Sequence, residues 1–189
     1  MNLAKESGGK SDMKLETKQE ILSWMKALVI GFTTVLLVRK FIFAPTTVHG
    51  QSMSPTLEDN ERVILRLLGY QPEQFDVVVI QHQEGPNWVK RIIGMPGQHV
   101  SFQDNQLFID GVLMEEIHLP PHAFTQDFTL EDICQFEHCA TIPEGYYLVL
   151  GDNRMNSGDS RHIGLIHEAQ ILGGVTWRFW PLPTFNRIR

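Results

Sequence analysis

Lysine is nearly missing from most of this chain of 189 residues. After Lys40 the sequence contains one lysine, Lys90, and the whole chain contains two cysteines. Residues 1–40 hold seven basic and four acidic residues, so they carry +3 of the net charge of −6 and the remainder carries −9. Nucleic-acid binding requires basic patches that contact phosphates, so the acidic body excludes that class of partner.

The two cysteines, Cys134 and Cys139, are too few for a disulfide scaffold. They fit either one disulfide that closes a small loop or two free thiols, and the sequence leaves both open. A zinc site would need these cysteines, His138 and a distant fourth ligand, and the chain has no second spaced pair to complete a tetrahedral set. We therefore expect no metal and no cofactor.

Long hydrophobic runs are also scarce, and the chain has one near its start. Residues 27–38 carry no charge, but as a helix they would span only about 18 Å. Residues 21–43 would span about 35 Å, enough for a hydrocarbon core of about 30 Å, provided that Lys26, Arg39 and Lys40 reach the two interfaces. This length predicts a transmembrane anchor.

A cleavable signal peptide is the alternative for this segment. Its cleavage site would be weak, because the small residue near its end, Ala44, precedes Pro45 and no A-x-A pattern is present. Basic residues gather before or at the opening of the segment, which predicts a cytoplasmic N-terminus. We therefore expect a disordered cytoplasmic tail at 1–18, an anchor at 19–44 and an extracytoplasmic domain at 45–189.

Short runs rich in β-branched and aromatic residues, separated by Gly, Pro and Asn, follow this segment. Such runs predict strands, here at residues 62–68, 76–80, 88–93, 98–102, 106–109, 146–150 and 174–179. Asp104-Asn105 and Asp110-Gly111 are typical of hairpin turns. The body is therefore predicted to be all-β, with a smaller inserted subregion at about 101–143.

Ser52 and Lys90 are candidates for a nucleophile and its base. Serine is a weak nucleophile until a base takes its proton, and a neutral amine can do so if its pKa falls from about 10.4 to roughly 7 to 8. Burial lowers the pKa of an amine, and apolar residues stand on both sides of the pair Lys90-Arg91. Arg91 would add a like charge only if its side chain pointed the same way, and strand alternation predicts that it points to the other face. Each residue alone is more typical of a structural position, a solvated strand lysine and a turn serine.

A third polar segment, Gly151 to Arg161, follows the predicted strand at 146–150 and reads G-D-N-R-M-N-S-G-D-S-R. A polar surface turn is the simplest interpretation. A calcium loop is excluded, because an arginine and a methionine stand where oxygen ligands would be needed. Asp159 and Arg161 are spaced to form an ion pair that braces the loop, and the Ser157 hydroxyl could orient the lysine.

Taken together, the three segments resemble the membrane-bound type I signal peptidases, most of all those of Gram-positive bacteria. The motifs are G-x-S-M-x-P-T-L around Ser52, V-K-R-I-I-G-x-P-G around Lys90, and G-D-N-R-x-N-S-x-D-S-R from Gly151 to Arg161. The resemblance covers nearly the whole chain. It implies a mainly β fold, with an N-terminal transmembrane helix followed by an antiparallel β-sheet or partial barrel that carries a small β excursion.

The resemblance also implies a function and a set of residue roles. The function is a serine endopeptidase that removes signal peptides from exported preproteins, with Ser52 as nucleophile and Lys90 as general base. Ser157 would support Lys90, and four charged residues would hold the loop: Asp152, Arg154, Asp159 and Arg161. The implied location is the cell membrane, crossed once, with membrane lipid and preprotein signal peptides as partners.

Two further expectations concern the substrate. The Gram-negative branch of the family places a serine two positions before the nucleophile in the oxyanion hole, and here that position is Gly50, so that backbone or water must supply the donor. Signal peptides end in small residues at positions −3 and −1. The resemblance places five apolar residues around two shallow pockets for them, unless these residues are simply core: Val48, Met53, Leu57, Val79 and Val89.

Two other functions remain as alternatives. Self-cleaving repressors share the Ser-Lys chemistry on a related fold, but they would carry a DNA-binding helical domain where this chain has its hydrophobic segment. A membrane-tethered β module that binds exported proteins without cutting them would not need Ser52 and Lys90, and both are present. Both alternatives therefore explain less of the sequence than a signal peptidase does.

Overall fold

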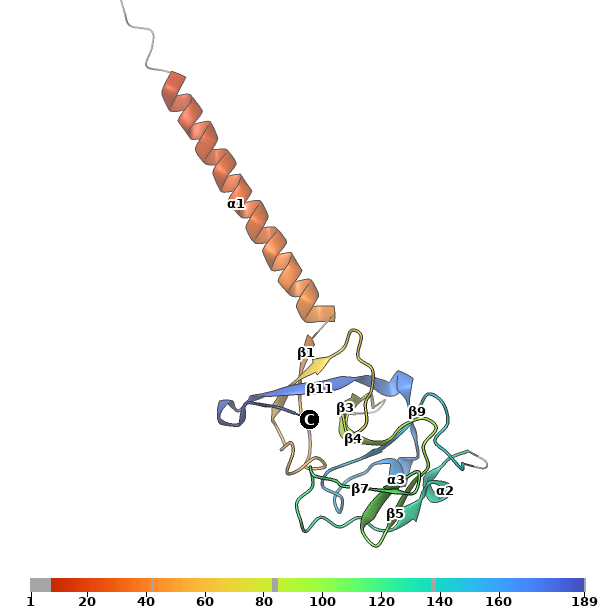
Figure 1. Ribbon diagram of the computed structural model, residues 1–189. Helices are drawn as coiled ribbons and strands as arrows, with labels where there is room; N and C mark the ends of the chain where they lie inside the picture. Colours follow the sequence, from red (N-terminus) through yellow and green to blue (C-terminus); the bar gives the residue numbers. More distant parts are fainter. Residues whose placement is uncertain (1–7, 42, 83–84, 137–138, 189) are drawn as a thin grey trace, which may run out of the picture. The chain divides into compact units, whose positions relative to one another are not determined.

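The structure is a computed structural model that describes residues 8–41, 43–82, 85–136 and 139–188. It divides into two compact units, one ending at residue 42 and the other beginning at residue 43. Figure 1 shows the order of the helices and strands along the chain. Each unit is described by itself.

The first unit contains one long helix, α1 (Gly8–Phe41). Its segment Glu20–Leu37 has a mean hydropathy of 1.6 and is long and apolar enough to cross a membrane, by length and composition. The helix begins within the segment 1–18 that the sequence predicts to be disordered. Residues 10–18 are rich in Lys, Met, Leu and Glu, which are good helix formers, and helical propensity explains this difference.

The second unit is built on a large antiparallel sheet. Among the described residues eight strands join it, in the order β1-β2-β11-β3-β4-β9-β10 with β12 paired to β11. Their bounds are β1 Phe43–Thr47, β2 Arg62–Arg66, β3 Val77–Ile80, β4 Trp88–Gly94, β9 Tyr146–Leu150, β10 Ile166–His167, β11 Ile171–Trp180 and β12 Asn186–Arg187.

A smaller antiparallel sheet, ordered β7-β6-β5-β8, lies between β4 and β9 in the chain. Its strands are β5 Val100–Gln103, β6 Gln106–Ile109, β7 Val112–Met114 and β8 Phe128–Thr129. The two turns that join β5, β6 and β7 have positive φ at Asp104, Asn105, Asp110 and Gly111, as two-residue hairpin turns require. Short helices complete the unit: α2 Leu130–Ile133, α3 Ser160–Ile163, η1 Glu168–Gln170 and η2 Leu182–Thr184.

The prediction of a mainly β fold with a small β excursion is confirmed. Two strands, β6 and β9, have the predicted bounds, and the other predicted strands shift or change length by a few residues. The sequence did not reveal β1, which begins at Phe43 inside the segment assigned to the anchor. Pro45 interrupts the strand signal there, yet a proline is tolerated because β1 pairs on one side with β2 and forms the edge of the sheet.

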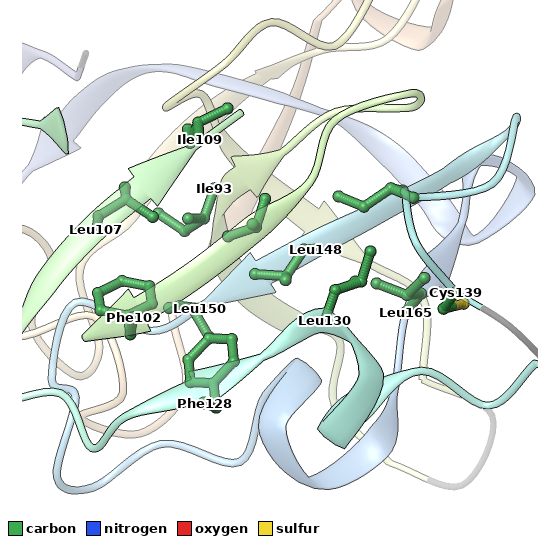
Figure 2. Packing of buried hydrophobic residues seen from close by; sticks show 12 residues of the cluster. Ile93, Phe102, Leu107, Ile109, Phe128, Leu130, Cys139, Leu148, Leu150 and Leu165 are labelled. Atoms are coloured by element: carbon green, nitrogen blue, oxygen red, sulfur yellow. The ribbon is translucent and has the colours of Figure 1, made fainter. Parts of the chain in front are cut away.

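Hydrophobic side chains fill the space between the small sheet and β9. Figure 2 shows residues of β5, β6 and β9 converging with Phe128 and Leu130. Phe102, Leu107 and Leu148 are at most 1% exposed. Cys134 and Cys139, which are joined by a disulfide, belong to the same cluster, so this open question of the sequence is answered in favour of the disulfide.

The strand order determines how the functional segments meet. Ser52 lies in the connection between β1 and β2, and Lys90 lies on β4, where it pairs with Val78 of β3. β11 lies between β2 and β3 and is therefore the strand that joins the β1–β2 hairpin to the β3–β4 hairpin. It pairs with both, through Arg66 on β2 and Val78 on β3, which both oppose Gly174.

We predict that deletion of residues 1–42 leaves the second unit folded, because no strand is lost. Deletion of residues 1–48 should lower stability by about 2 kcal/mol or more, because it also removes β1 and Val48, a side chain that is 1% exposed. Thermal unfolding followed by circular dichroism measures both deletions. Equal melting temperatures for the two would show that β1 does not stabilise the sheet.

Candidate active site

Ser52 is held by a tight turn whose neighbouring side chains are buried. Met53 and Leu57 are 1% and 0% exposed, and the Leu57 N–H donates to the Met53 carbonyl at 2.9 Å. The Ser52 carbonyl accepts a hydrogen bond from the Asn153 N–H at 3.0 Å, and the Asn153 side-chain amide donates to the Gln51 carbonyl at 3.0 Å. These contacts fix the serine between the sheet and the loop that follows β9.

Lys90 lies directly against this serine. Its Nζ is 2.7 Å from Ser52 Oγ, and the residue is only 3% exposed. The pKa of Lys90 is lowered to about 8, mainly because burial disfavours the ammonium form; the carboxylates of Asp159 and Asp152 oppose this shift, and the charge of Arg161 adds to it. A large share of the amine is therefore neutral near pH 8 and can accept a proton.

The loop from Gly151 to Arg161 is held by Asp159, which is fully buried. Its Oδ2 accepts from the Gly151 N–H at 2.9 Å, and both of its oxygens accept from the Arg161 guanidinium at 2.8 Å. Burial alone would raise the pKa of Asp159, but these hydrogen bonds and the charge of Arg161 outweigh it and lower the pKa. The ion pair predicted from the spacing of Asp159 and Arg161 is therefore present.

Asp152 is paired with Arg91, which lies next to Lys90 on β4. The guanidinium donates to both carboxylate oxygens, at 2.9 and 2.7 Å, and both side chains are buried. Adjacent strand residues point to opposite faces, so the charge of Arg91 is turned away from Lys90. His118 lies 3.8 Å from Asp152, and burial together with Arg91 lowers the pKa of His118 to about 4, so its ring is neutral at physiological pH.

Arg154 ties the loop from Gly151 to Arg161 to the connection between β7 and β8. Its guanidinium forms a two-pronged ion pair with Glu116 and donates to Thr125 Oγ1 at 2.8 Å. Its Nε donates to the Gly151 carbonyl at 3.1 Å, and its charge lies 5.5 Å from the ring centre of Phe102 on β5. The small sheet therefore helps to hold the loop that faces Ser52.

Ser157 belongs to the same loop. Its Oγ is buried and lies close enough to Asp159 to help lower the pKa of that carboxyl, although it makes no well-directed hydrogen bond among the described residues. A Cβ added at Gly151 would collide with Ser157 Oγ and with the Ser52 carbonyl, so the three groups are in close contact. The described contacts include no hydrogen bond between Ser157 and Lys90, and a supporting role for Ser157 stays a prediction.

Gly50 has a backbone conformation that explains its lack of a side chain. Its φ is +81°, and its N–H donates to Asp59 Oδ1 at 2.8 Å. A Cβ there would meet no atom within 4 Å, so space is available. The positive φ would still cost any side chain roughly 1–2 kcal/mol, which disfavours a serine at this position.

The five apolar residues expected around the substrate pockets all belong to one buried cluster: Val48, Met53, Leu57, Val79 and Val89. Each is at most 4% exposed, so these side chains are mainly part of the hydrophobic core. Val79 and Val89 also line a hollow of about 280 Å³ beside Thr47 and His49, at the end of β1. That hollow is where a small substrate side chain would fit, and its use stays a prediction.

Several residues that hold the site were not identified from the sequence. Arg91, Glu116, Thr125 and His118 are partners of the loop, and three of them lie in the excursion between β6 and β8. Their positions are 29 to 61 residues from their partners, so no local spacing links them. Alternation along β4 did indicate correctly that Arg91 points away from Lys90.

Comparison with known proteins assigns the family. Residues 21–180 match the family described as signal peptidase, peptidase S26. Signal peptidase IB of Staphylococcus aureus (strain COL) is 40% identical over 180 residues, which cover 89% of this chain and 94% of that protein. Signal peptidase I of Bacillus amyloliquefaciens is 38% identical over 182 residues, with coverage of 93% and 95%.

A solved structure is also similar. The crystal structure of a signal peptidase I from Enterococcus faecalis V583 has 37% sequence identity and a TM-score of 0.49, and it covers 56% of this chain and 97% of its own. The curated relatives extend over most of the sequence, and the family match, at residues 21–180, spans the three segments around Ser52, Lys90 and the loop after β9. The chain therefore belongs to the signal peptidase family, peptidase S26, and is a serine peptidase.

Proposed function

We propose that this protein removes signal peptides from exported preproteins by means of a Ser52–Lys90 dyad. The observation that carries the proposal is the 2.7 Å contact between Ser52 Oγ and a lysine amine that is almost fully buried. A hydroxyl becomes a nucleophile when a positioned base accepts its proton, and an amine is such a base once its pKa approaches the working pH.

The reaction follows from this contact. Neutral Lys90 takes the proton of Ser52 as Oγ attacks the scissile carbonyl carbon, and the new ammonium then gives that proton to the departing amine of the mature protein. Water next attacks the acyl-serine and loses a proton to Lys90. As the bond between the acyl carbon and Ser52 Oγ breaks, Lys90 returns that proton to Oγ, and the signal peptide leaves as a carboxylic acid that ionises in solution. The oxyanion of the tetrahedral intermediate accepts hydrogen bonds from the Ser52 N–H and from a second donor. That donor is a backbone group or a water molecule, because Gly50 has no hydroxyl to donate.

Substrate selection is proposed to depend on small pockets. The hollow of about 280 Å³ beside Val79 and Val89 is proposed to take the small residues at −3 and −1 of the signal peptide. Because β1 forms an edge of the large sheet, an extended substrate has backbone groups with which to pair nearby. Specificity would then come from side chains that point alternately into the pockets.

Anchoring by α1 is proposed to place the enzyme at the outer face of the cytoplasmic membrane, with the N-terminus inside. The support is the apolar span Glu20–Leu37 together with the basic residues that precede it, which favour the cytoplasmic side. A signal peptide enters the same bilayer, so anchoring raises its concentration near the enzyme. The partners are then membrane lipid and signal peptides, with no nucleic acid.

We predict that Ser52→Ala and Lys90→Ala each abolish cleavage, and that the double variant is hardly worse than either, because the two groups act as one unit. Lys90→Arg should be equally inactive, because a guanidinium stays protonated and cannot serve as base. The assay is cleavage of a preprotein, followed by sequencing of the new N-terminus. A folded Lys90→Arg variant that still cuts would exclude the dyad.

We predict that kcat/KM for a neutral peptide rises with pH through an apparent pKa of about 8 and then levels off. The sign follows from the role of Lys90, which is protonated and inactive as a base below that pKa and neutral above it. A rise that begins only near pH 10, the range of a solvated lysine, would contradict a buried base. Circular dichroism at each pH separates a change in rate from unfolding.

We predict that Lys90→Met, although inactive, raises the free energy of unfolding at pH 7. The pKa of Lys90 falls from 10.5 unfolded to about 8 folded, so the destabilisation is complete below pH 8 and fades as the pH rises toward 10.5. The buried ammonium destabilises the folded state by about 3 kcal/mol at pH 7. Loss of the hydrogen bond to Ser52 removes roughly 1 kcal/mol of the gain that Lys90→Met would otherwise bring. Urea unfolding at pH 7 and pH 10 measures the difference in free energy of unfolding between Lys90→Met and wild type. A variant that is less stable than wild type at pH 7 would refute this prediction.

A further inference from the structure

A second hollow lies near the segment that carries Ser52, with Ser54, Pro55 and Asn153 in its wall. It encloses about 320 Å³ between Ser54 and Pro55, the Pro120–Phe124 stretch, and the loop residues through Met155. It shares no lining residue with the hollow at the end of β1. The two hollows are therefore separate, and each includes residues within three positions of Ser52, His49 in one and Ser54 in the other.

The walls of this second hollow are bonded to the nucleophile segment. Asn153, which lines it, donates its N–H to the Ser52 carbonyl at 3.0 Å and its side-chain amide to the Gln51 carbonyl. Ser54, also in the wall, donates its N–H to the same Gln51 carbonyl at 3.2 Å. A peptide bond positioned at Ser52 Oγ therefore has this hollow within reach of the residues next to it.

The exposed side chains of the wall are those of Met155, Phe124 and Pro55, which are apolar, and of His122, which is polar. Met155 is 75% exposed and Phe124 is 51% exposed, and both also border a neighbouring depression of about 560 Å³, so they form a ridge between the two. The charged residues in the wall, Asp152 and Arg154, are buried and paired with Arg91 and Glu116. A flexible thioether and a phenyl ring adapt to apolar side chains of different shapes.

An endopeptidase must hold polypeptide on both sides of the bond that it cuts. If the hollow beside Val79 and Val89 takes the residues before the cut, the residues after the cut extend toward Ser54 and Met155. We propose that Met155 and Phe124 form a subsite for the first residues of the mature protein and that this subsite favours an apolar side chain at position +1 or +2. The inference rests on the proposed function, because it assumes cleavage at Ser52.

The test uses the full chain in detergent micelles and internally quenched peptides with identical small residues at −3 and −1. Positions +1 and +2 are varied one at a time among Ala, Leu and Glu, because an extended peptide directs alternate side chains to one face. Wild type should prefer Leu to Glu at one of these positions by about tenfold in kcat/KM, in the range that one pocket contact gives.

The decisive variant is Met155→Lys, with Phe124→Lys as a second. A lysine there should reverse the preference: kcat/KM should rise for the Glu peptide and fall for the Leu peptide. Preferences at −1 and −3 should stay as in wild type. The control is Leu113→Lys on β7, which replaces another exposed apolar side chain, 54% exposed, outside both hollows. This control should cut all peptides with the wild-type ratios.

Different failures have different meanings. If wild type cuts no peptide after the small residue at −1, the proposed function is refuted, and the subsite is refuted with it. If wild type cuts but the Leu-to-Glu ratio is the same in Met155→Lys, only the subsite is refuted. The subsite is also refuted if Leu113→Lys shifts the ratio equally, which would indicate a general charge effect, or if Met155→Lys changes only binding to lipid vesicles.

Discussion

The active site depends on keeping one amine away from water while it contacts one hydroxyl. Lys90 achieves this on β4, a strand with neighbours on both sides, where it is 3% exposed. Its neighbour Arg91 is turned to the opposite face, and its charge is neutralised by Asp152 instead of adding to the field at Nζ. The same strand therefore supplies a base that is easily deprotonated and a permanent cation that organises the loop after β9.

The loop that carries Asn153 to Ser52 is stiffened by buried charges, each with a fixed partner. Asp152, Arg154 and Asp159 are all at most 4% exposed, and their partners lie on β4, in the excursion and within the loop itself. A buried charge without its partner is strongly destabilising, so each pair favours one arrangement of the loop over alternatives. The small sheet is thus part of the catalytic framework, although it contributes no reacting group.

The sequence predicted the elements whose signals are local. β6 and β9 are bounded by turn residues, and the pair Asp159 and Arg161 is set by a spacing of two, so both were identified. β1 was missed because its apolar residues continue those of the preceding helix. The partners of Asp152 and Arg154 could not be found, because packing of the two sheets brings together residues up to 61 positions apart. The backbone of Gly50 was equally hidden, since its φ depends on the fold of the whole turn.

The place of β11 in the sheet has a consequence for biosynthesis. β11 joins the hairpin that carries Ser52 to the hairpin that carries Lys90, and it is translated long after both. The roughly 80 residues from Lys90 to β11 take about 4 to 16 seconds to synthesise at about 5 to 20 residues per second. During that interval the nascent chain contains both members of the proposed dyad but not the strand that lies between their hairpins. Under the proposed mechanism, a new molecule would be inert toward its own N-terminal helix, and toward neighbouring secretory chains, until its synthesis is nearly complete.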